Sequence, residues 1–325
     1  MLAGAAGILG GCGGGGRASL MLVGSGAGSA SDGLARLAAR FLEARSGERI
    51  AVENEARAGG KLAAERLARA KPDGRLLAFL PTGLLYAALL DEPGVRWSLP
   101  AFAWIGSLGS DRRVLITTAG SGVRRFAQLI GREQPLLLPA TSASSPGYYE
   151  PLIVRHLTGA RLKPVPGFVG GARNHALVAG EADAIVGSLD GLRSVLELPG
   201  SQIILRLNDL PLPDGRAAPT LAAFARGPDA GPLLALVEAH ARLGRIAALP
   251  PRTPAPVLAE WRRRFAALAA DPAFRSEALA RGYLIELTPG EAVAARVGAL
   301  LGGDAAGVGE ALRRALSPAG RGPAG

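Results

Sequence analysis

Three short loops rich in small and hydroxyl-bearing residues are the segments of this sequence best suited to bind a small molecule. They lie at residues 28–32, 81–83 and 141–145, and each follows an apolar run of strand type. The amino end of a helix carries unpaired N–H groups and about half a positive charge, so it holds a carboxylate without a basic side chain. The same residue types are common helix N-caps, which is the structural explanation for any single loop. Because ligands bind at the carboxyl ends of parallel strands, the three loops together indicate a shared anion-binding edge.

The first loop also fits a second kind of site. Gly24 and Gly26 follow a strand-type run and Glu53 ends the next one, which imitates a dinucleotide-binding fingerprint. In that frame a serine, Ser29, stands in place of the third glycine. No acid or base suited to hydride transfer is evident downstream. A dinucleotide-dependent oxidoreductase therefore stays an alternative.

Other catalytic and metal sites find little support. The single cysteine, Cys12, cannot form an internal disulfide or a cysteine zinc site, and His156, His175 and His240 lack metal-ligand spacing. The HExxH, CxxC and GxSxG motifs do not occur. We therefore expect a protein that is not an enzyme and carries neither a metal nor a cofactor.

The charge of the chain does not point to nucleic acid. The formal net charge is +10, but only three of the 37 basic residues are lysines and the arginines are scattered. No basic stripe with interleaved aromatic residues occurs, as base stacking would require. With 48% apolar and 20% charged residues, the 325-residue chain is typical of a globular protein of two domains. No apolar run reaches the roughly 18–20 residues of a membrane span.

The first residues resemble the end of a bacterial lipoprotein signal. An apolar stretch at residues 2–11 leads into Cys12, and four glycines follow. Leu9, Gly10, Gly11 and Cys12 form the lipobox in this interpretation, with Cys12 lipidated and the glycines as a flexible tether. No Lys or Arg precedes the apolar stretch, and a disordered Gly/Ala-rich terminus is the alternative.

Short apolar runs alternate with longer helical patterns, which predicts βαβ units and parallel sheets. The expected strands lie at residues 20–23, 50–53, 76–80, 104–108, 114–117, 136–138, 162–165, 184–186 and 203–207. The expected helices begin near residue 34 and lie at 62–70, 148–157, 172–179, 232–243, 254–270, 272–280 and 289–301. The Gly-, Ala- and Pro-rich tail after Gly302 is expected to fray.

Taken together, the loops resemble the Bug-type solute-binding receptors of tripartite tricarboxylate transporters. The family's Gly-rich loop, its VENxxGAGG segment and its PDG turn correspond to residues 28–36, 52–60 and 70–74. Its VPYKGGA, GGEVD and VPTLAE segments correspond to residues 165–172, 180–183 and 219–221, and its C-terminal pattern to residues 253–289. The resemblance covers roughly residues 20–300 in order and spacing.

This resemblance implies an α/β fold of two lobes, the periplasmic-binding-protein or Venus-flytrap fold, each lobe a mainly parallel sheet flanked by helices. Residues 1–19 would form the lipoprotein-type signal and Gly-rich tether. Residues 20–118 and about 245–325 would form the first lobe, and residues 119–244 the second.

The resemblance also implies ligand contacts from both lobes, which hold a carboxylate partly through water. The positions that match are Gly28, Ser29, Ala30, Ser31, Thr82, Ser142, Ser144, Ser145 and Ser188. Asp32 is expected to cap its own helix. Gly187 stands where many members carry an aspartate, and Arg245 and Arg252 have no counterpart to which a role can be assigned.

The implied function is capture of a small organic acid outside the cytoplasmic membrane and delivery to an integral membrane permease. The expected protein is a monomer in the periplasm or cell envelope, tethered to the membrane if Cys12 is lipidated. A ligand-binding sensor that feeds no transporter is the further alternative, and the identity of the carboxylate stays open.

Overall fold

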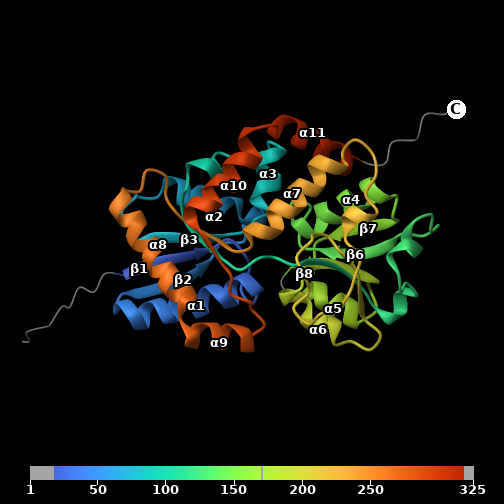
Figure 1. Cartoon of the computed structure of the whole chain (residues 1–325), viewed down its shortest axis with the longest axis horizontal. Coiled ribbons are helices and arrows are strands. Elements are labelled where there is room, and N and C mark those ends of the chain that lie inside the picture. The colour runs from blue at the N-terminus through green and yellow to red at the C-terminus, as the bar shows by residue number, and fades with distance from the viewer. Residues whose placement is uncertain (1–17, 170, 318–325) are drawn as a thin grey trace, which may run out of the picture.

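The computed structural model describes residues 18–169 and 171–317, which fold into two α/β lobes lying side by side (Figure 1). No helix in these ranges is long and apolar enough to cross a membrane. Cys12 and the proposed tether up to residue 17 lie outside the described residues.

The first lobe contains a six-stranded sheet of order β11-β4-β10-β3-β1-β2. The strands are β1 (Ala18–Val23), β2 (Arg49–Asn54), β3 (Leu76–Leu80), β4 (Ala103–Leu108), β10 (Ile246–Leu249) and β11 (Leu287–Pro289). Strand β1 is parallel to β2 and β3, whereas β10 is antiparallel to β3 and β4, and β11 is antiparallel to β4.

Helices cover both faces of this sheet, because successive buried residues of β1 point to opposite faces. Met21 and Val23 pack with α1 (Ala30–Ser46), α8 (Ala255–Ala270) and α9 (Pro272–Ala280). Leu22 points to the other face, toward α2 (Lys61–Arg69) and α10 (Gly290–Gly302). Successive strand residues face opposite sides, so an all-apolar strand such as β1 is buried on both.

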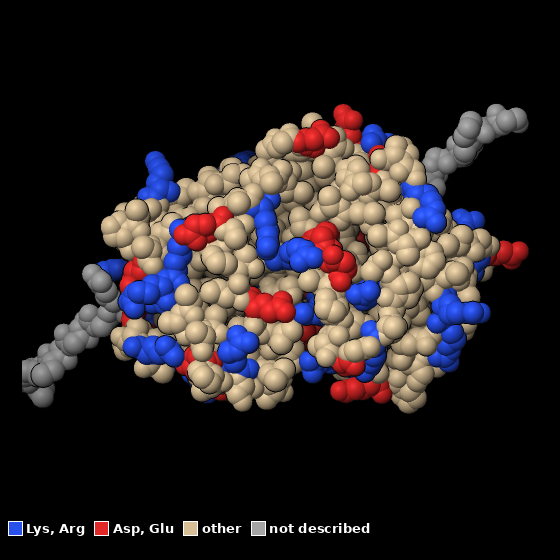
Figure 2. All heavy atoms as spheres, in the orientation of Figure 1, with Lys and Arg blue, Asp and Glu red and all other residues tan. Residues whose placement is uncertain are grey.

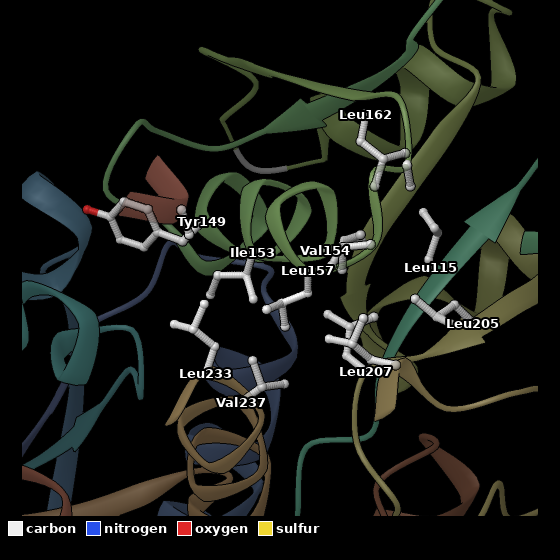
Figure 3. Packing of buried hydrophobic residues seen from close by; sticks show 14 of the residues in the cluster. Leu115, Tyr149, Ile153, Val154, Leu157, Leu162, Leu205, Leu207, Leu233 and Val237 are labelled. Atoms are coloured by element: carbon white, nitrogen blue, oxygen red, sulfur yellow. The ribbon is translucent and has the colours of Figure 1, made fainter. Parts of the chain in front are cut away.

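The second lobe contains a three-stranded antiparallel sheet and a parallel strand pair. Strand β5 (Arg113–Thr117) lies between β8 (Ala184–Ser188) and β9 (Gln202–Arg206), and β6 (Leu136–Ala140) pairs with β7 (Leu162–Pro166). The helices are α4 (Pro146–Thr158), α5 (Ala172–Val178), α6 (Arg193–Leu196) and α7 (Ala230–Leu243). Figure 3 shows how Ile153 and Leu157 of α4 pack with Leu233 and Val237 of α7.

Two further helices join the lobes. Helix α3 (Leu84–Leu89) follows β3 of the first lobe, yet Tyr86 and Leu89 belong to the same core cluster as α4. Helix α11 (Ala305–Leu316) also packs on α4 and α7 through Ala311, Leu312 and Ala315, which are buried. The core of the second lobe is therefore completed by segments from both sides of the boundary.

The structure corrects three expectations from the sequence. The tail after Gly302 is not frayed as far as Leu316, because α11 buries an apolar stripe. That helix packs mainly on α4 and α7 of the second lobe, with smaller contacts to α3 and α10, and β5 likewise pairs with second-lobe strands, although residues up to 118 were assigned to the first. Strand β1 begins at Ala18, inside the segment assigned to the tether.

The nine expected strands are all present with small shifts in their ends, but β10 and β11 were missed. These two strands run antiparallel to β4, and β5 runs antiparallel to both its neighbours. Among the described strands, parallel pairing occurs in β2-β1-β3 and β6-β7.

Candidate functional site

The loops singled out in the sequence meet at the boundary between the lobes. A Cβ added at Gly83 would lie 2.9 Å from Cδ of Pro146, the first residue of α4, and one added at Gly191 would lie 4.0 Å from Cβ of Ala30. A Cβ at Gly59 would lie 3.3 Å from the carbonyl oxygen of Ser144. Loops at the carboxyl ends of β1, β3, β6 and β8 therefore converge from both lobes.

On the first lobe, the loop before α1 is held by its own helix. Ser29 is the N-cap and accepts a hydrogen bond from the Asp32 amide at 3.2 Å, while the Gly28 amide donates to the Asp32 carboxylate at 2.9 Å. Burial opposes ionisation of Asp32, but hydrogen bonds from Asn54 and Gly28 lower its pKa. Ser29, not Asp32, is therefore the N-cap, and Asp32 lies in the first turn, where its carboxylate holds the preceding loop through the Gly28 amide. Ser31 makes no hydrogen bond to any described residue, so its hydroxyl is available.

On the second lobe, the loop before α4 closes on itself without an acidic residue. The Ser145 hydroxyl donates to the Ser142 carbonyl at 2.7 Å, and the hydroxyls of Ser142 and Ser144 lie 3.3 Å apart. Helix α4 has no acidic residue in its first turn, and its N-cap side chain bonds no helix amide. The positive end of α4 is therefore not neutralised from within the helix.

The other two expected positions lie deeper in the boundary. The Thr82 hydroxyl is buried and lies 2.8 Å from Nε2 of His240 on α7. The Ser188 hydroxyl, at the end of β8, is buried and makes no hydrogen bond to any described residue. It lies near Asp111, whose Oδ1 is also buried without a partner. Polar atoms in this state are candidates for contact with water or a ligand.

A buried charge network beneath these loops was missed from the sequence. Arg113 of β5 donates from Nε to both oxygens of Glu150, at 2.9 and 3.0 Å, and from Nη2 to Oε2 at 2.5 Å. Glu150 is fully buried on α4, and burial raises its pKa even though Arg113 acts in the opposite direction. Glu150, a single charge within an apolar run, was the signal available in the sequence, whereas Arg113 follows two other charged residues and gives no such signal.

His240 extends this network to the first lobe. Its Nε2 contacts Thr82, its Nδ1 lies 3.5 Å from Glu150, and its ring packs on Tyr86 with centroids 5.2 Å apart. Burial, followed by the charge of Arg113, lowers the pKa of His240 to about 3. The folded protein therefore keeps this imidazole neutral well below pH 6.5, its ordinary range.

We expect the stability of the protein to fall as the pH is lowered from about 7 to 5. In that window the unfolded chain protonates His240 but the folded chain does not, so acid favours unfolding by on the order of 1–2 kcal/mol. Chemical unfolding at both pH values measures this. In the variant His240→Gln, the part of the pH dependence of the free energy of unfolding that comes from His240 should disappear. The raised pKa of Glu150 changes this free energy with the opposite sign, and it does so in both proteins. An unchanged slope in the variant would contradict the assignment to His240.

Direct contacts between the lobes surround the site. Arg245, just before β10 of the first lobe, pairs with Asp190 of the second at 3.1 Å, and its guanidinium lies 5.5 Å from the centre of the Tyr283 ring. Arg193 donates to the Gly282 carbonyl at 3.3 Å. The Tyr149 hydroxyl donates to Glu92 across the same boundary. Arg245, to which the sequence assigned no role, therefore joins the lobes.

Two residues that suggested a dinucleotide site, Gly24 and Glu53, have structural partners. A Cβ at Gly24 would lie 2.6 Å from Cδ of Pro81, so close packing with the next loop requires a glycine there. Glu53 receives hydrogen bonds from Arg66. Within the described residues, no group of three or more His, Cys, Asp or Glu side chains is arranged to hold a metal ion.

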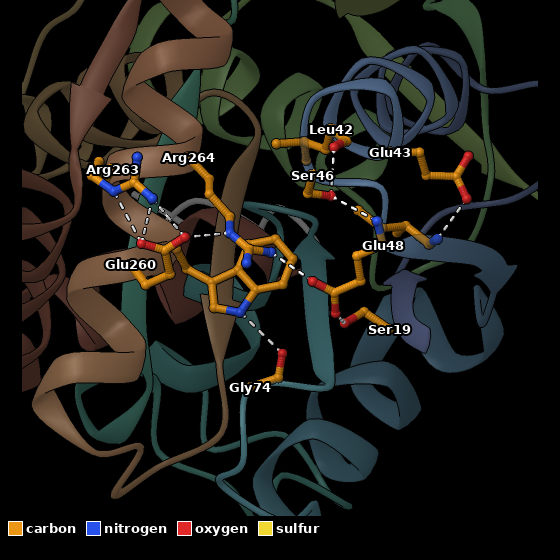
Figure 4. Close-up of polar contacts among 11 residues, drawn as sticks. Ser19, Leu42, Glu43, Ser46, Glu48, Gly74, Glu260, Arg263 and Arg264 are labelled. Atoms are coloured by element: carbon orange, nitrogen blue, oxygen red, sulfur yellow. Dashed lines mark hydrogen bonds and ion pairs between the residues drawn. The ribbon is translucent and has the colours of Figure 1, made fainter. Parts of the chain in front are cut away.

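A surface hollow at the opposite edge of the six-stranded sheet is a poorer candidate. It lies at the amino ends of β2 and β3, where Trp261 donates to the Gly74 carbonyl and Arg264 donates to Glu48 (Figure 4). Ligands of such sheets bind at the carboxyl ends of the strands. On the face seen in Figure 2, basic and acidic side chains are interspersed, with no continuous basic stripe.

Comparison with known proteins identifies the fold. No protein-family model matches the chain, and no curated protein matches it in sequence. Among solved structures, a TctC solute-binding protein from Polaromonas has 17% sequence identity and a TM-score of 0.67, with 92% of this chain and 98% of that chain covered. The periplasmic binding protein BugD has 20% identity and a TM-score of 0.71, covering 92% and 97%. MatC from Rhodopseudomonas palustris, solved with bound malate, has 20% identity and a TM-score of 0.71, covering 90% and 99%. This chain therefore has the two-lobed α/β fold of the TctC and BugD solute-binding proteins, over almost its whole length.

Proposed function

We propose that this protein is an extracytoplasmic solute-binding protein that captures a small carboxylate between its lobes and delivers it to a membrane permease. The observation that carries the proposal is the convergence of helix-capping loops from both lobes, with Ser31 and Ser144 on opposite sides. A carboxylate at this point would accept hydrogen bonds from backbone amides and hydroxyls of both lobes.

The roles of the individual residues follow from how they are already bonded. Ser29 and Ser145 maintain their own loops and would present backbone amides, together with Gly28, Ala30 and Ser142. The hydroxyls of Ser31 and Ser144 are the ones that a ligand would meet first, since the Ser144 hydroxyl lies within hydrogen-bond distance only of the Ser142 hydroxyl, and the Ser31 hydroxyl makes no hydrogen bond to a described residue. Ser188 and Thr82 would form the bottom of the site. His240 holds the Thr82 hydroxyl in place by a hydrogen bond.

Binding is coupled to closure of the lobes in this proposal. A ligand shifts a conformational equilibrium only by contacts that differ between the two states, and contacts to both lobes at once exist only in the closed state. We place the first lobe at residues 18–112 and 245–304 and the second at residues 113–244 and 305–317, so that the chain crosses between them near Gly109, Gly244 and Gly303. A monomer, tethered to the membrane by a lipid on Cys12, completes the proposal.

The proposal is tested by a thermal-shift screen of the protein from residue 18 onward. The panel is acetate, benzoate, succinate, malate, adipate, citrate, glutamate and NAD. A compound that binds only the native state raises the melting temperature by mass action, so at least one carboxylate should give a shift of several degrees. A shift with NAD alone would favour the oxidoreductase instead, and no shift with any acid would contradict carboxylate capture.

We expect the double variant Ser31→Ala, Ser144→Ala to bind the acid found in that screen at least about tenfold more weakly. Each hydroxyl that hydrogen-bonds a charged group contributes on the order of 1 kcal/mol or more. Isothermal titration calorimetry measures the dissociation constant, and unchanged thermal unfolding of the ligand-free variant shows that it folds. Ser276→Ala, an exposed serine on α9, is the matched control. A dissociation constant equal to that of the wild type would refute this placement of the site.

A further inference from the structure

Arg173 lies directly beneath the loop at the amino end of α4. It is the second residue of α5, and its guanidinium donates from Nε to the Pro139 carbonyl at 3.1 Å and from Nη2 to the Val186 carbonyl at 2.6 Å. These carbonyls belong to the carboxyl ends of β6 and β8, the strands that lead into residues 141–145 and Ser188. The charge is thus fixed at the second-lobe wall of the boundary.

Two glycines leave room for this guanidinium. A Cβ added at Gly147 would lie 3.3 Å from Nη2 of Arg173, and one added at Gly187 would lie 3.5 Å from the same atom. Gly147 is the second residue of α4, so the guanidinium lies next to the first turn of that helix. Its charge and the positive helix end act on the same space.

Arg173 has no counter-ion of its own. No carboxylate of a described residue lies within ion-pair distance of it, and its Nη1 donates to no described acceptor. Burial, together with the charge of Arg113, lowers the pKa of Arg173 to about 10, while the more distant Glu150 acts in the opposite direction. An unpaired and partly desolvated cation is costly, and an anion placed beside it relieves that cost.

The corresponding place on the first lobe is different. There the amino end of α1 already holds the carboxylate of Asp32, which is 4% exposed and accepts from the Gly28 amide and from Asn54. On that side the helix end and Arg36, whose Nε lies 2.9 Å from Asp32 Oδ1, share one carboxylate of the protein, whereas on the second lobe Arg173 adds a cation to the helix end. The helix end on the first lobe therefore faces a carboxylate of the protein, and the one on the second lobe does not.

We propose that Arg173 and the amino end of α4 form the anion-binding pole of the site, so that the ligand places a carboxylate on the second lobe. The ligand needs no second charge at the first lobe, where the Asp32 carboxylate already lies at the helix end. This inference rests on the proposed function and adds the orientation of the ligand and a residue that determines specificity.

The test uses the acid of the thermal-shift panel that binds the wild type, together with its amides. For a diacid, the dissociation constants of the wild type for the acid and for its monoamide should agree within about threefold, because the anion-binding pole binds only one carboxylate. The fully amidated form should bind more than tenfold more weakly. Arg173→Gln should lower the affinity for the acid and the monoamide by about 10- to 100-fold and change that for the neutral amide by less than threefold.

Two further variants separate charge recognition from structure. Arg173→Lys keeps the charge and should recover most of the lost affinity for the acid. Arg206→Gln is the matched control, because Arg206 also donates only to backbone carbonyls (Ala218, Asp209 and Leu210) but lies away from these loops. It should leave all affinities unchanged.

The outcomes distinguish this inference from the proposed function. If the wild type binds an acid but Arg173→Gln keeps its affinity, or loses the acid and the neutral amide equally, the inference is overturned and carboxylate capture stands. If the wild type binds no acid of the panel, both are overturned.

Discussion

Replacing Glu150 with alanine is expected to lower the free energy of unfolding by about 3–5 kcal/mol, the largest effect of any single substitution considered for this protein. Glu150 is 0% exposed and accepts three hydrogen bonds from Arg113, which is itself 7% exposed. Its removal leaves the Arg113 guanidinium buried, with Asp111 at 3.4 Å as the nearest remaining acid. The cost arises because Arg113 loses its closest carboxylate and stays in a medium that solvates its charge poorly.

Urea unfolding followed by circular dichroism measures this change. The control is Glu310→Ala on α11, whose ion pair with Arg314 is long, at 3.8 Å, and solvent-exposed, so that its loss should change stability by less than about 0.5 kcal/mol. A loss below 1 kcal/mol for Glu150→Ala would mean that Arg113 finds water or another acid on relaxation. The network would then not be a rigid support for α4.

The elements that the sequence predicts well are those with local signals. Strand β3 is bounded as expected because the turn at residues 71–74 ends one helix and a helix-capping loop follows at 81–83. Strand β10 was missed because four residues, Ile-Ala-Ala-Leu, carry neither alternation nor β-branched enrichment beyond one isoleucine. Its conformation depends on pairing with β3 and β4, which lie more than 130 residues earlier in the chain.

The same distinction applies to the site. The loops at residues 28–32 and 141–145 could be predicted because N-cap chemistry is local. Arg173 could not, since its partners are carbonyls of Pro139 and Val186, which only the folded sheet brings together. The contact of Thr82 with His240 joins residues 158 positions apart, and no spacing rule in one sequence indicates it.

Helix α11 shows how composition can conceal an element. Gly307 and Gly309 made the segment resemble a linker, but a Cβ at Gly309 would lie 2.6 Å from the Leu89 carbonyl oxygen, so the glycine permits close approach to α3. Leu312, on the same helix, is 0% exposed in the core cluster that also contains residues of α4 and α7.

We therefore expect Leu312→Ala to lower the free energy of unfolding by about 2–5 kcal/mol, the range for a leucine removed from a packed core. The loss combines the transfer free energy of the side chain with the cavity left between α11 and its neighbours. The matched control is Leu279→Ala on α9, where the same change removes a side chain that is 59% exposed and should cost less than about 0.5 kcal/mol. Equal, small effects of the two substitutions would show that α11 does not belong to the cooperative core. A large effect confined to Leu312 would establish that the chain after Gly302 completes the second lobe, and with it the platform on which α4 presents its positive end to a ligand.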